Sequence, residues 1–234
     1  MVTTFQHYQS NMDLEPIWLS IKLAILTTFI LLVIGIPVAY WLSKKSTIGR
    51  LIIEAFITMP LVLPPSVLGF YLLLAFSPNN SLGHWLQQHF NVQLVFSFEG
   101  LVVASLIYSL PFMFSPIYSA FSHLPKSLAE ASYTMGKSKM ETFLHIQLPN
   151  IKSSILTAAV LTFAHTLGEF GVVLMIGGNI PGVTKVASIA IYDAVETMDY
   201  GAANDYALIL FAITFTIVFA VFLFNRNAVK NPFE

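Results

Sequence analysis

Five long apolar stretches constrain this chain more than any other feature of its sequence. They are residues 16–42, 51–76, 100–122, 151–176 and 205–225. A helix needs about 20 mostly apolar residues to cross the ~30 Å hydrocarbon core of a bilayer. The stretches are continuous and do not alternate, unlike the strands of a membrane β-barrel. The sequence therefore predicts an all-α integral membrane protein with about five transmembrane helices.

Composition supports a membrane protein and excludes several other classes. The chain is 56% hydrophobic and only 10% charged, whereas soluble domains carry about 25% charged residues. A net charge of −1 gives no indication of nucleic-acid binding. Because there is no cysteine, disulfides and thiol chemistry are excluded. With no internal repeat and no Gly/Ser/Pro-rich linker, residues 1–234 are expected to form one membrane domain.

The distribution of lysine and arginine predicts the orientation, because loops rich in these residues stay in the cytoplasm. One side of the predicted membrane carries nine of the eleven: Lys44, Lys45, Arg50, Lys126, Lys137, Lys139, Lys152, Arg226 and Lys230. The loops of the other side carry only Lys185, and Lys22 lies inside the first stretch near that face. We therefore expect the N-terminus outside and the C-terminus in the cytoplasm.

A proline cluster interrupts the second stretch, where residues 60–65 read PLVLPP. Proline removes a backbone hydrogen bond and kinks a membrane helix, which is tolerated against other protein or a water-lined cavity. Residues 60–65 are therefore expected to form a distorted segment that lies against protein or a pathway, with Pro64 and Pro65 as candidates for a pathway or gate. The alternative is an ordinary kinked helix that only packs against its neighbours.

The loop at 123–150 has the composition of two short amphipathic helices, broken near Gly136 and ended by Pro149. Their apolar stripes comprise Leu128, Ala131, Tyr133, Met135, Met140, Phe143, Leu144 and Ile146. Such helices beneath a membrane indicate a docking surface for a partner. A helix resting on lipid headgroups has a similar pattern.

The spacing within this loop resembles the EAA loop of bacterial ABC import permeases. That pattern reads E-A-A, three residues, G, nine residues, I-x-L-P. The matching residues are Glu130, Ala131, Gly136, Ile146, Leu148 and Pro149, with Ser132 in place of the second alanine. The resemblance implies that this loop is a coupling helix that fits a groove of a separate ATPase subunit.

Further segments resemble molybdate-import permeases: 59–70 (MPLVLPPSVLGF), 166–171 (TLGEFG) and 177–192 (GGNIPGVTKVASIAIY). Tungstate cannot be separated from molybdate on this basis, and sulfate/thiosulfate permeases share the general plan. The resemblance implies a type I ABC importer permease fold in a bacterial cytoplasmic membrane. It also implies a homodimer with two ATPase subunits, an oxyanion-binding protein outside, and alternating access. ATP would be used by the partner, so no enzymatic activity and no bound cofactor are expected here.

Glu169 is an acidic residue within the fourth stretch, and carboxylates inside a membrane indicate function. His165 lies four residues earlier and could pair with it on one helix face. Glu169 could line the pathway or gate, bond neighbouring helices, or relay protons. A structural or near-gate role fits the flanking Gly168 and Gly171 best, and Phe170 joins these candidates.

Three alternatives stay open or are disfavoured by the remaining residues. Gly136-Lys137-Ser138 resembles the end of a phosphate-binding loop, but position 131 is alanine where that motif requires glycine. A secondary carrier using Glu169 and His165 is a rival, although no internal repeat is visible. A membrane enzyme is disfavoured because the sequence contains no recognisable cluster of catalytic residues.

The outer loops are acidic and cannot attract a dianion. Capture of the cargo is therefore expected to belong to a separate protein.

Overall fold

The computed structural model describes residues 13–229, and over that range its regular structure is entirely helical. Three helices are each long and apolar enough to cross a membrane: α1 (Glu15–Ser43), α5 (Phe98–His123) and α12 (Tyr200–Val229). They coincide with the first, third and fifth apolar stretches. The predicted all-α membrane fold is therefore confirmed.

The second and fourth stretches are bent rather than straight. In the second, α2 (Ile48–Thr58) and a 3₁₀ turn η1 (Met59–Leu61) lead into α3 (Pro65–Phe76) with a bend of 109°. In the fourth, α9 (Lys152–Leu167) and α10 (Gly171–Gly177) meet at 57°. Residues 13–229 thus contain three helices that are long and apolar enough to span a membrane, or up to five such spans if each bent pair crosses as one unit. The distortion predicted at the proline cluster is confirmed, and the break at 168–170 was not predicted.

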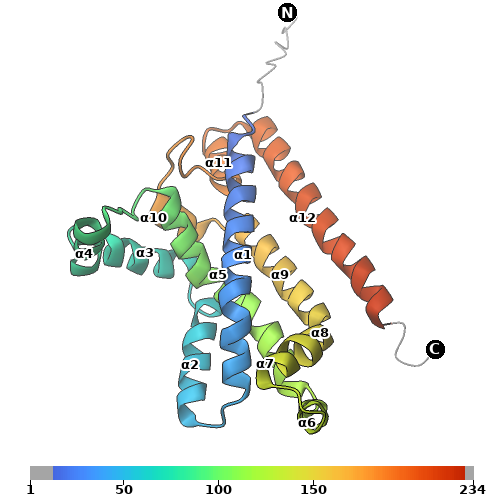
Figure 1. Ribbon diagram of the computed structural model, residues 1–234. Helices are drawn as coiled ribbons and strands as arrows, with labels where there is room; N and C mark the ends of the chain where they lie inside the picture. Colours follow the sequence, from blue (N-terminus) through green and yellow to red (C-terminus); the bar gives the residue numbers. More distant parts are fainter. Residues whose placement is uncertain (1–12, 230–234) are drawn as a thin grey trace, which may run out of the picture.

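The core forms where α1, α5 and α9 pack side by side (Figure 1). Fully buried alanines, such as Ala39 on α1 and Ala158 on α9, let the helix backbones approach closely. Larger side chains of α5, among them Met113 and Phe114, fill the space between the helices. Because lipid is as apolar as leucine, this close packing is what holds membrane helices together.

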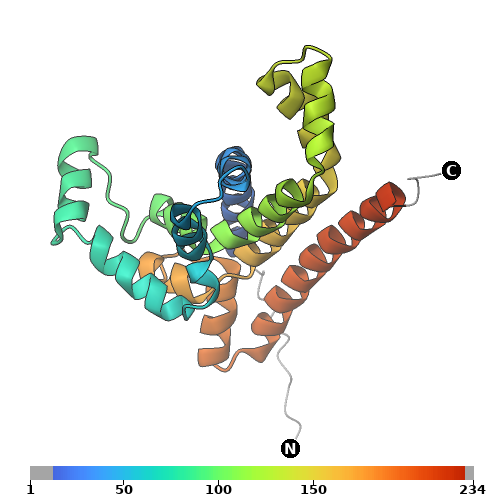
Figure 2. The ribbon, with the colours of Figure 1, turned by 90° about the horizontal axis from the view of Figure 1, so that it is seen from below.

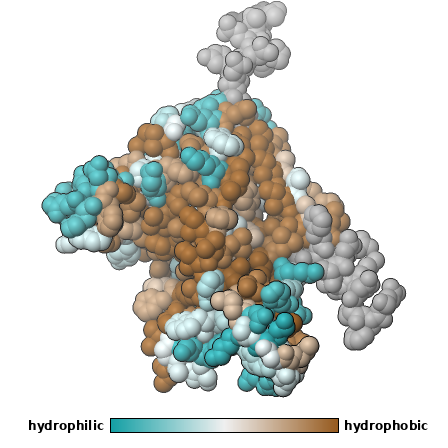
Figure 3. Space-filling view, in the orientation of Figure 1, coloured by the Kyte–Doolittle hydropathy of each residue, from teal (hydrophilic) through white to brown (hydrophobic). Residues whose placement is uncertain are grey.

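Helix α12 leans away from the central bundle and packs mainly along α11 and α9 (Figures 1 and 2). Its outward face carries the stacked rings of Phe211, Phe215 and Phe219, all more than half exposed. The space-filling view shows a broad apolar band with hydrophilic residues gathered at its two ends (Figure 3). This distribution is typical of a protein whose middle faces lipid.

Two further helices lie in segments that the sequence analysis treated as loops. Helix α4 (Ser81–Phe90) follows α3 on an arm that extends sideways from the bundle, and α11 (Ala187–Glu196) packs against α12 (Figure 2). Both are only ten residues long. Helix α11 lies at the end of the bundle where α1 begins (Figure 1).

The segment 123–150 occupies the opposite end of the bundle (Figure 1). It contains α6 (Lys126–Thr134), α7 (Lys139–Thr142), a π-helical segment η2 (Phe143–Gln147) and α8 (Leu148–Asn150). The helical path from α7 through η2 and α8 ends at Asn150, one residue after Pro149, and Ile151 separates it from α9. The expected helix end near Pro149 is therefore confirmed.

Candidate functional site

The turn between α6 and α7 depends on Gly136, whose φ is +79°. Residues with a Cβ rarely adopt this left-handed conformation, so glycine is favoured here. The Gly136 and Lys137 amides donate to the carbonyl oxygens of Tyr133 and Ser132, at 2.9 and 3.1 Å. These bonds satisfy carbonyls at the end of α6. The predicted break between two short helices at Gly136 is therefore confirmed.

Helix α7 begins with a capping box rather than a phosphate-binding loop. The Glu141 amide donates to the Ser138 hydroxyl at 3.2 Å, and the Ser138 amide donates to Glu141 Oε2 at 2.8 Å. These hydrogen bonds to Ser138 lower the pKa of the Glu141 carboxyl. Ser138 thus serves to start a helix.

A buried hydroxyl pair joins the two helices of this segment. Ser132 Oγ lies 2.9 Å from Thr142 Oγ1, and both residues are buried. The Thr142 hydroxyl also lies 2.9 Å from the Ser138 carbonyl oxygen, to which it donates. Ser132 is the one departure from the EAA pattern, and an alanine there could not make this contact. The sequence showed only serine in place of the second alanine and did not reveal this link.

The outward side of the segment presents apolar side chains that are largely exposed in the part of the chain that the structure describes. Met135 is 79% exposed and Met140 is 65% exposed, and Tyr133 and Leu144 are also exposed. Of the EAA residues, Glu130, Ala131 and Pro149 are exposed, while Ile146 and Leu148 are half-buried. Exposed methionines and aromatics beside charged residues are typical of a protein-docking surface. Their part in docking stays a prediction.

Glu169 lies in the break between α9 and α10, not inside a continuous helix as the sequence analysis assumed. Its Oε1 accepts a hydrogen bond from the Val172 amide at 3.1 Å, and its backbone oxygen accepts one from the Ser188 hydroxyl. Its Oε2 lies 3.8 Å from His165 Nε2. The carboxylate therefore replaces a missing helical hydrogen bond at the start of α10, which explains how the chain bends here.

The break opens onto a pocket of about 460 Å³, and most of the candidate pathway residues line it. It is lined by Pro65, Ser66, Tyr108, His165, Gly168, Glu169, Phe170 and Gly171. Pro64 precedes α3 as its N-cap and is not among the lining residues. The His165 ring stacks on Phe112 with centroids 4.0 Å apart. The structure thus brings the proline cluster and the 165–171 segment together, and their role in the pathway stays a prediction.

Two substitutions separate a structural role of Glu169 from proton transfer. Glu169→Gln keeps an oxygen for the Val172 amide, so we expect near-normal uptake and thermal stability. Glu169→Leu leaves that buried amide unpaired, which costs about 1–3 kcal/mol, so we expect a lower Tm and reduced uptake. Thermal unfolding in detergent and cargo uptake measure both. Loss of uptake in Glu169→Gln at unchanged Tm would favour the proton-relay role instead.

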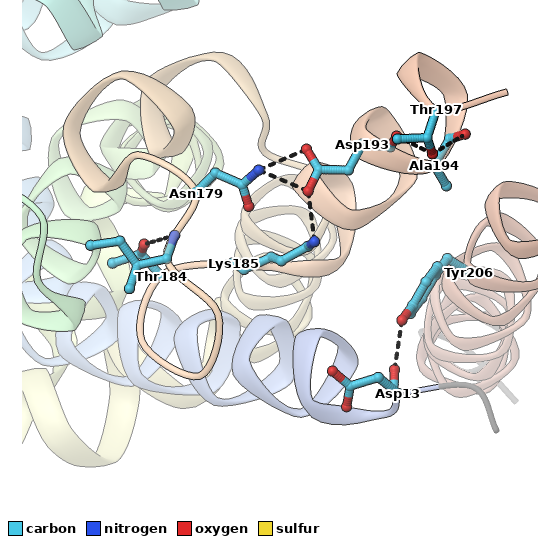
Figure 4. Close-up of polar contacts among 9 residues, drawn as sticks. Asp13, Asn179, Thr184, Lys185, Asp193, Ala194, Thr197 and Tyr206 are labelled. Carbon is cyan, nitrogen blue, oxygen red and sulfur yellow. Dashed lines mark hydrogen bonds and ion pairs between the residues drawn. The ribbon is translucent and has the colours of Figure 1, made fainter. Parts of the chain in front are cut away.

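The end of the molecule opposite to the segment 123–150 carries an acidic surface whose loop lysine, Lys185, is already paired. Lys185 Nζ lies 2.6 Å from Asp193 Oδ2, and the Asn179 amide donates to both oxygens of Asp193 (Figure 4). The Tyr206 hydroxyl donates to the Asp13 backbone oxygen and fastens α12 to the start of α1. Lys185 is thus neutralised, while the exposed Lys22 of α1 has its Nζ 4.5 Å from the centroid of the Phe98 ring, so this described surface offers little positive charge to a free dianion.

Comparisons with known proteins identify the family. The family model "Binding-protein-dependent transport system inner membrane component" matches residues 12–230. The molybdenum transport system permease protein ModB of Azotobacter vinelandii is 43% identical over 217 residues, covering 93% of this chain and 96% of ModB. The sulfate transport system permease protein CysT of Escherichia coli is 30% identical over 189 residues, covering 81% of this chain and 68% of CysT.

Solved structures show the same fold at low sequence identity. The MetNI methionine ABC transporter matches with a TM-score of 0.71 and 18% identity, over 94% of this chain and 97% of that one. A bacterial ABC transporter that imports the polysaccharide alginate matches with a TM-score of 0.77 and 16% identity, over 95% and 82%. This chain therefore belongs to the family of binding-protein-dependent transport system inner membrane components and has the fold of ABC importer permeases.

Proposed function

We propose that this chain is the membrane-spanning permease subunit of an ATP-driven importer of molybdate, with tungstate as an equivalent cargo. The observation that carries the proposal is the 43% identity to a molybdenum permease over 93% of the chain. Relatives named for sulfate transport are less similar and longer than the matched region. A sulfate or thiosulfate permease is therefore the second candidate.

The assembly that fits this function is a homodimer of permease chains with two ATPase subunits in a bacterial cytoplasmic membrane. An oxyanion-binding protein on the outer side would deliver the cargo, which suits an acidic outer surface whose loop lysine, Lys185, is paired with Asp193. No cofactor is proposed for this chain, because ATP would be bound and hydrolysed by the partner. The exposed apolar side of α6 and α7 would contact the ATPase.

The proposed mechanism is alternating access. Closure of the two ATPase subunits on ATP would move α6 and α7, and η2 and α8 lead from these helices directly to α9. Helix α9 ends at the pocket beside Glu169, where α3 and α10 meet. Movement of the segment 123–150 would thus be transmitted to the centre of the bundle along one nearly continuous helical path. The pathway at the centre would then open alternately to the two faces of the membrane.

The orientation gives a topology prediction. We expect reporters fused after Lys45, Lys137 and Lys230 to be cytoplasmic, and reporters after Asn80 and Asp199 to be external. Lys230 and the Arg226 side chain lie outside the part that the structure describes, and the other seven positive charges of the predicted inner side support the assignment. Paired alkaline phosphatase and green fluorescent protein fusions measure each position. An external location at Lys137 would contradict the docking role of 123–150.

The cargo and the partner are tested together in the purified complex. We expect the chain to co-purify with an ATPase, and the molybdate- or tungstate-loaded binding protein to stimulate ATP hydrolysis several-fold. Sulfate with the same binding protein is the matched control and should leave the basal rate unchanged. Equal stimulation by sulfate would favour the second candidate. Uptake without any associated ATPase would favour a secondary carrier.

A further inference from the structure

A basic pocket of about 400 Å³ lies between the C-terminal end of α1 and the segment that begins at α6. Three lysines line it: Lys44 from the end of α1, Lys126 from the start of α6, and Lys139 from the start of α7. Glu130 is the single carboxylate among its lining residues. In the described part of the chain, none of these four side chains forms an ion pair. The pocket therefore has an excess of uncompensated positive charge.

Two features of the surrounding helices add to its preference for an anion. Helix α6 is nine residues long and begins at Lys126, so the positive end of its dipole and its free N–H groups lie at the pocket. Lys44 Nζ rests 5.2 Å from the centroid of the Tyr40 ring, which also lines the pocket. This contact restrains the ammonium group at the edge of the cavity.

The remaining polar group is the side chain of Gln147, which lines the pocket and is only 2% exposed. Its Oε1 is buried and has no hydrogen-bond donor. Buried amides in native proteins are almost always paired, so this unpaired oxygen of a pocket-lining residue is a candidate to accept a hydrogen bond from a bound ligand. Because Oε1 is an acceptor, that group must carry a donor such as a hydroxyl.

These observations fit a ligand with an anionic group, such as a phosphate, and a neighbouring hydroxyl. We propose that the pocket binds the headgroup of an anionic glycerophospholipid, with phosphatidylglycerol as the chemistry that fits best. The phosphate would lie among the three lysines, and a glycerol hydroxyl would donate to Gln147. The proposal rests on the proposed orientation, which places the pocket in the cytoplasmic leaflet where lipid phosphates lie. A molybdate dianion could contact the lysines but has no hydroxyl for Gln147.

Titration of lipid into the delipidated permease–ATPase complex, followed by native mass spectrometry, tests the site. We expect phosphatidylglycerol to bind the wild type more tightly than phosphatidylethanolamine does. Removing each lysine should weaken binding by a factor of about five, and the triple variant Lys44→Gln/Lys126→Gln/Lys139→Gln by roughly a hundredfold. The matched control Lys45→Gln/Lys137→Gln/Lys152→Gln removes the same number of charges from the same end of the helical bundle, but outside the pocket. It should retain binding.

A second variant tests the hydroxyl contact separately from charge. Gln147→Leu keeps the side-chain volume, so we expect weaker binding of phosphatidylglycerol and unchanged binding of phosphatidic acid, which lacks the second glycerol. Equal losses in the triple variant and its control would overturn the site, as would displacement of the lipid by millimolar molybdate or inorganic phosphate. Because the titration requires no cargo, failure of molybdate transport would not affect its outcome.

Discussion

Gly136→Val is expected to abolish uptake while the chain still inserts in the membrane at normal levels. The φ of +79° at this turn strains any residue with a Cβ, and a β-branched one most. An ideal Cβ at this position meets nothing within 4 Å, so the strain comes from the backbone alone. Displacing a packed anchor of an interface commonly costs ~2 kcal/mol, which is about a thirtyfold loss of affinity for the ATPase.

The matched control for this substitution is Gly136→Asn, because asparagine adopts the left-handed conformation at lower cost. We expect it to retain most of the association and uptake. Glu130→Lys tests the same surface differently, since it reverses an exposed charge without touching the turn. Pull-down of the ATPase and uptake are measured for all three. Wild-type association in both Gly136→Val and Glu130→Lys would show that the segment does not couple the permease to the ATPase.

The second large effect, a loss of stability and uptake, is expected from substitutions at two glycines where α3 packs against α10. A Cβ added at Gly69 would lie 2.7 Å from Met175 Cβ, and one added at Gly171 would lie 2.7 Å from Pro65 Cβ. Both distances are shorter than real Cβ contacts, so the helices would have to separate. We expect Gly69→Ala and Gly171→Ala each to cost about 1–3 kcal/mol of stability, and the double variant to lose uptake.

Gly49→Ala provides the control for this prediction. It lies on α2, and the nearest atom to an added Cβ is Thr47 Oγ1 at 3.9 Å, so an alanine fits. We expect unchanged or slightly higher stability, since alanine favours a helix over glycine. Thermal unfolding in detergent and uptake are compared for the four proteins. A double variant with normal Tm and uptake would mean that the close α3–α10 contact is not needed for function.

The sequence predicted the long helices well because each depends on a property that a single segment carries. Twenty or more apolar residues must be helical in lipid, whatever their neighbours are. The bend at 60–65 was predicted for the same reason, since proline itself removes the hydrogen bond. The break at Glu169 was not predicted, because contacts of Glu169 with Val172 and Ser188 stabilise it and hydropathy does not reveal such contacts.

In the candidate sites, too, a feature that depends on local sequence was predicted, and features that depend on tertiary packing were missed. Gly136 was placed correctly because a glycine between two amphipathic patterns is a local signal. The Ser132–Thr142 pair and the burial of Gln147 depend on how η2 packs beneath α6 and were missed. The Ser138–Glu141 spacing, three residues apart before an apolar run, is a capping-box signal that could have been found in the sequence. Helices α4 and α11 were missed because ten residues do not stand out between membrane spans.

Oxyanion uptake by the reconstituted complex tests the central claim most directly. Proteoliposomes containing this chain and its ATPase, with ATP at the ATPase face and the binding protein at the other, are supplied with molybdate, tungstate or sulfate. We predict ATP-dependent accumulation of molybdate and tungstate, with sulfate at the level of liposomes lacking ATP. Accumulation of sulfate at a comparable rate, or of molybdate without ATP, would contradict the assignment as a molybdate-importing ABC permease.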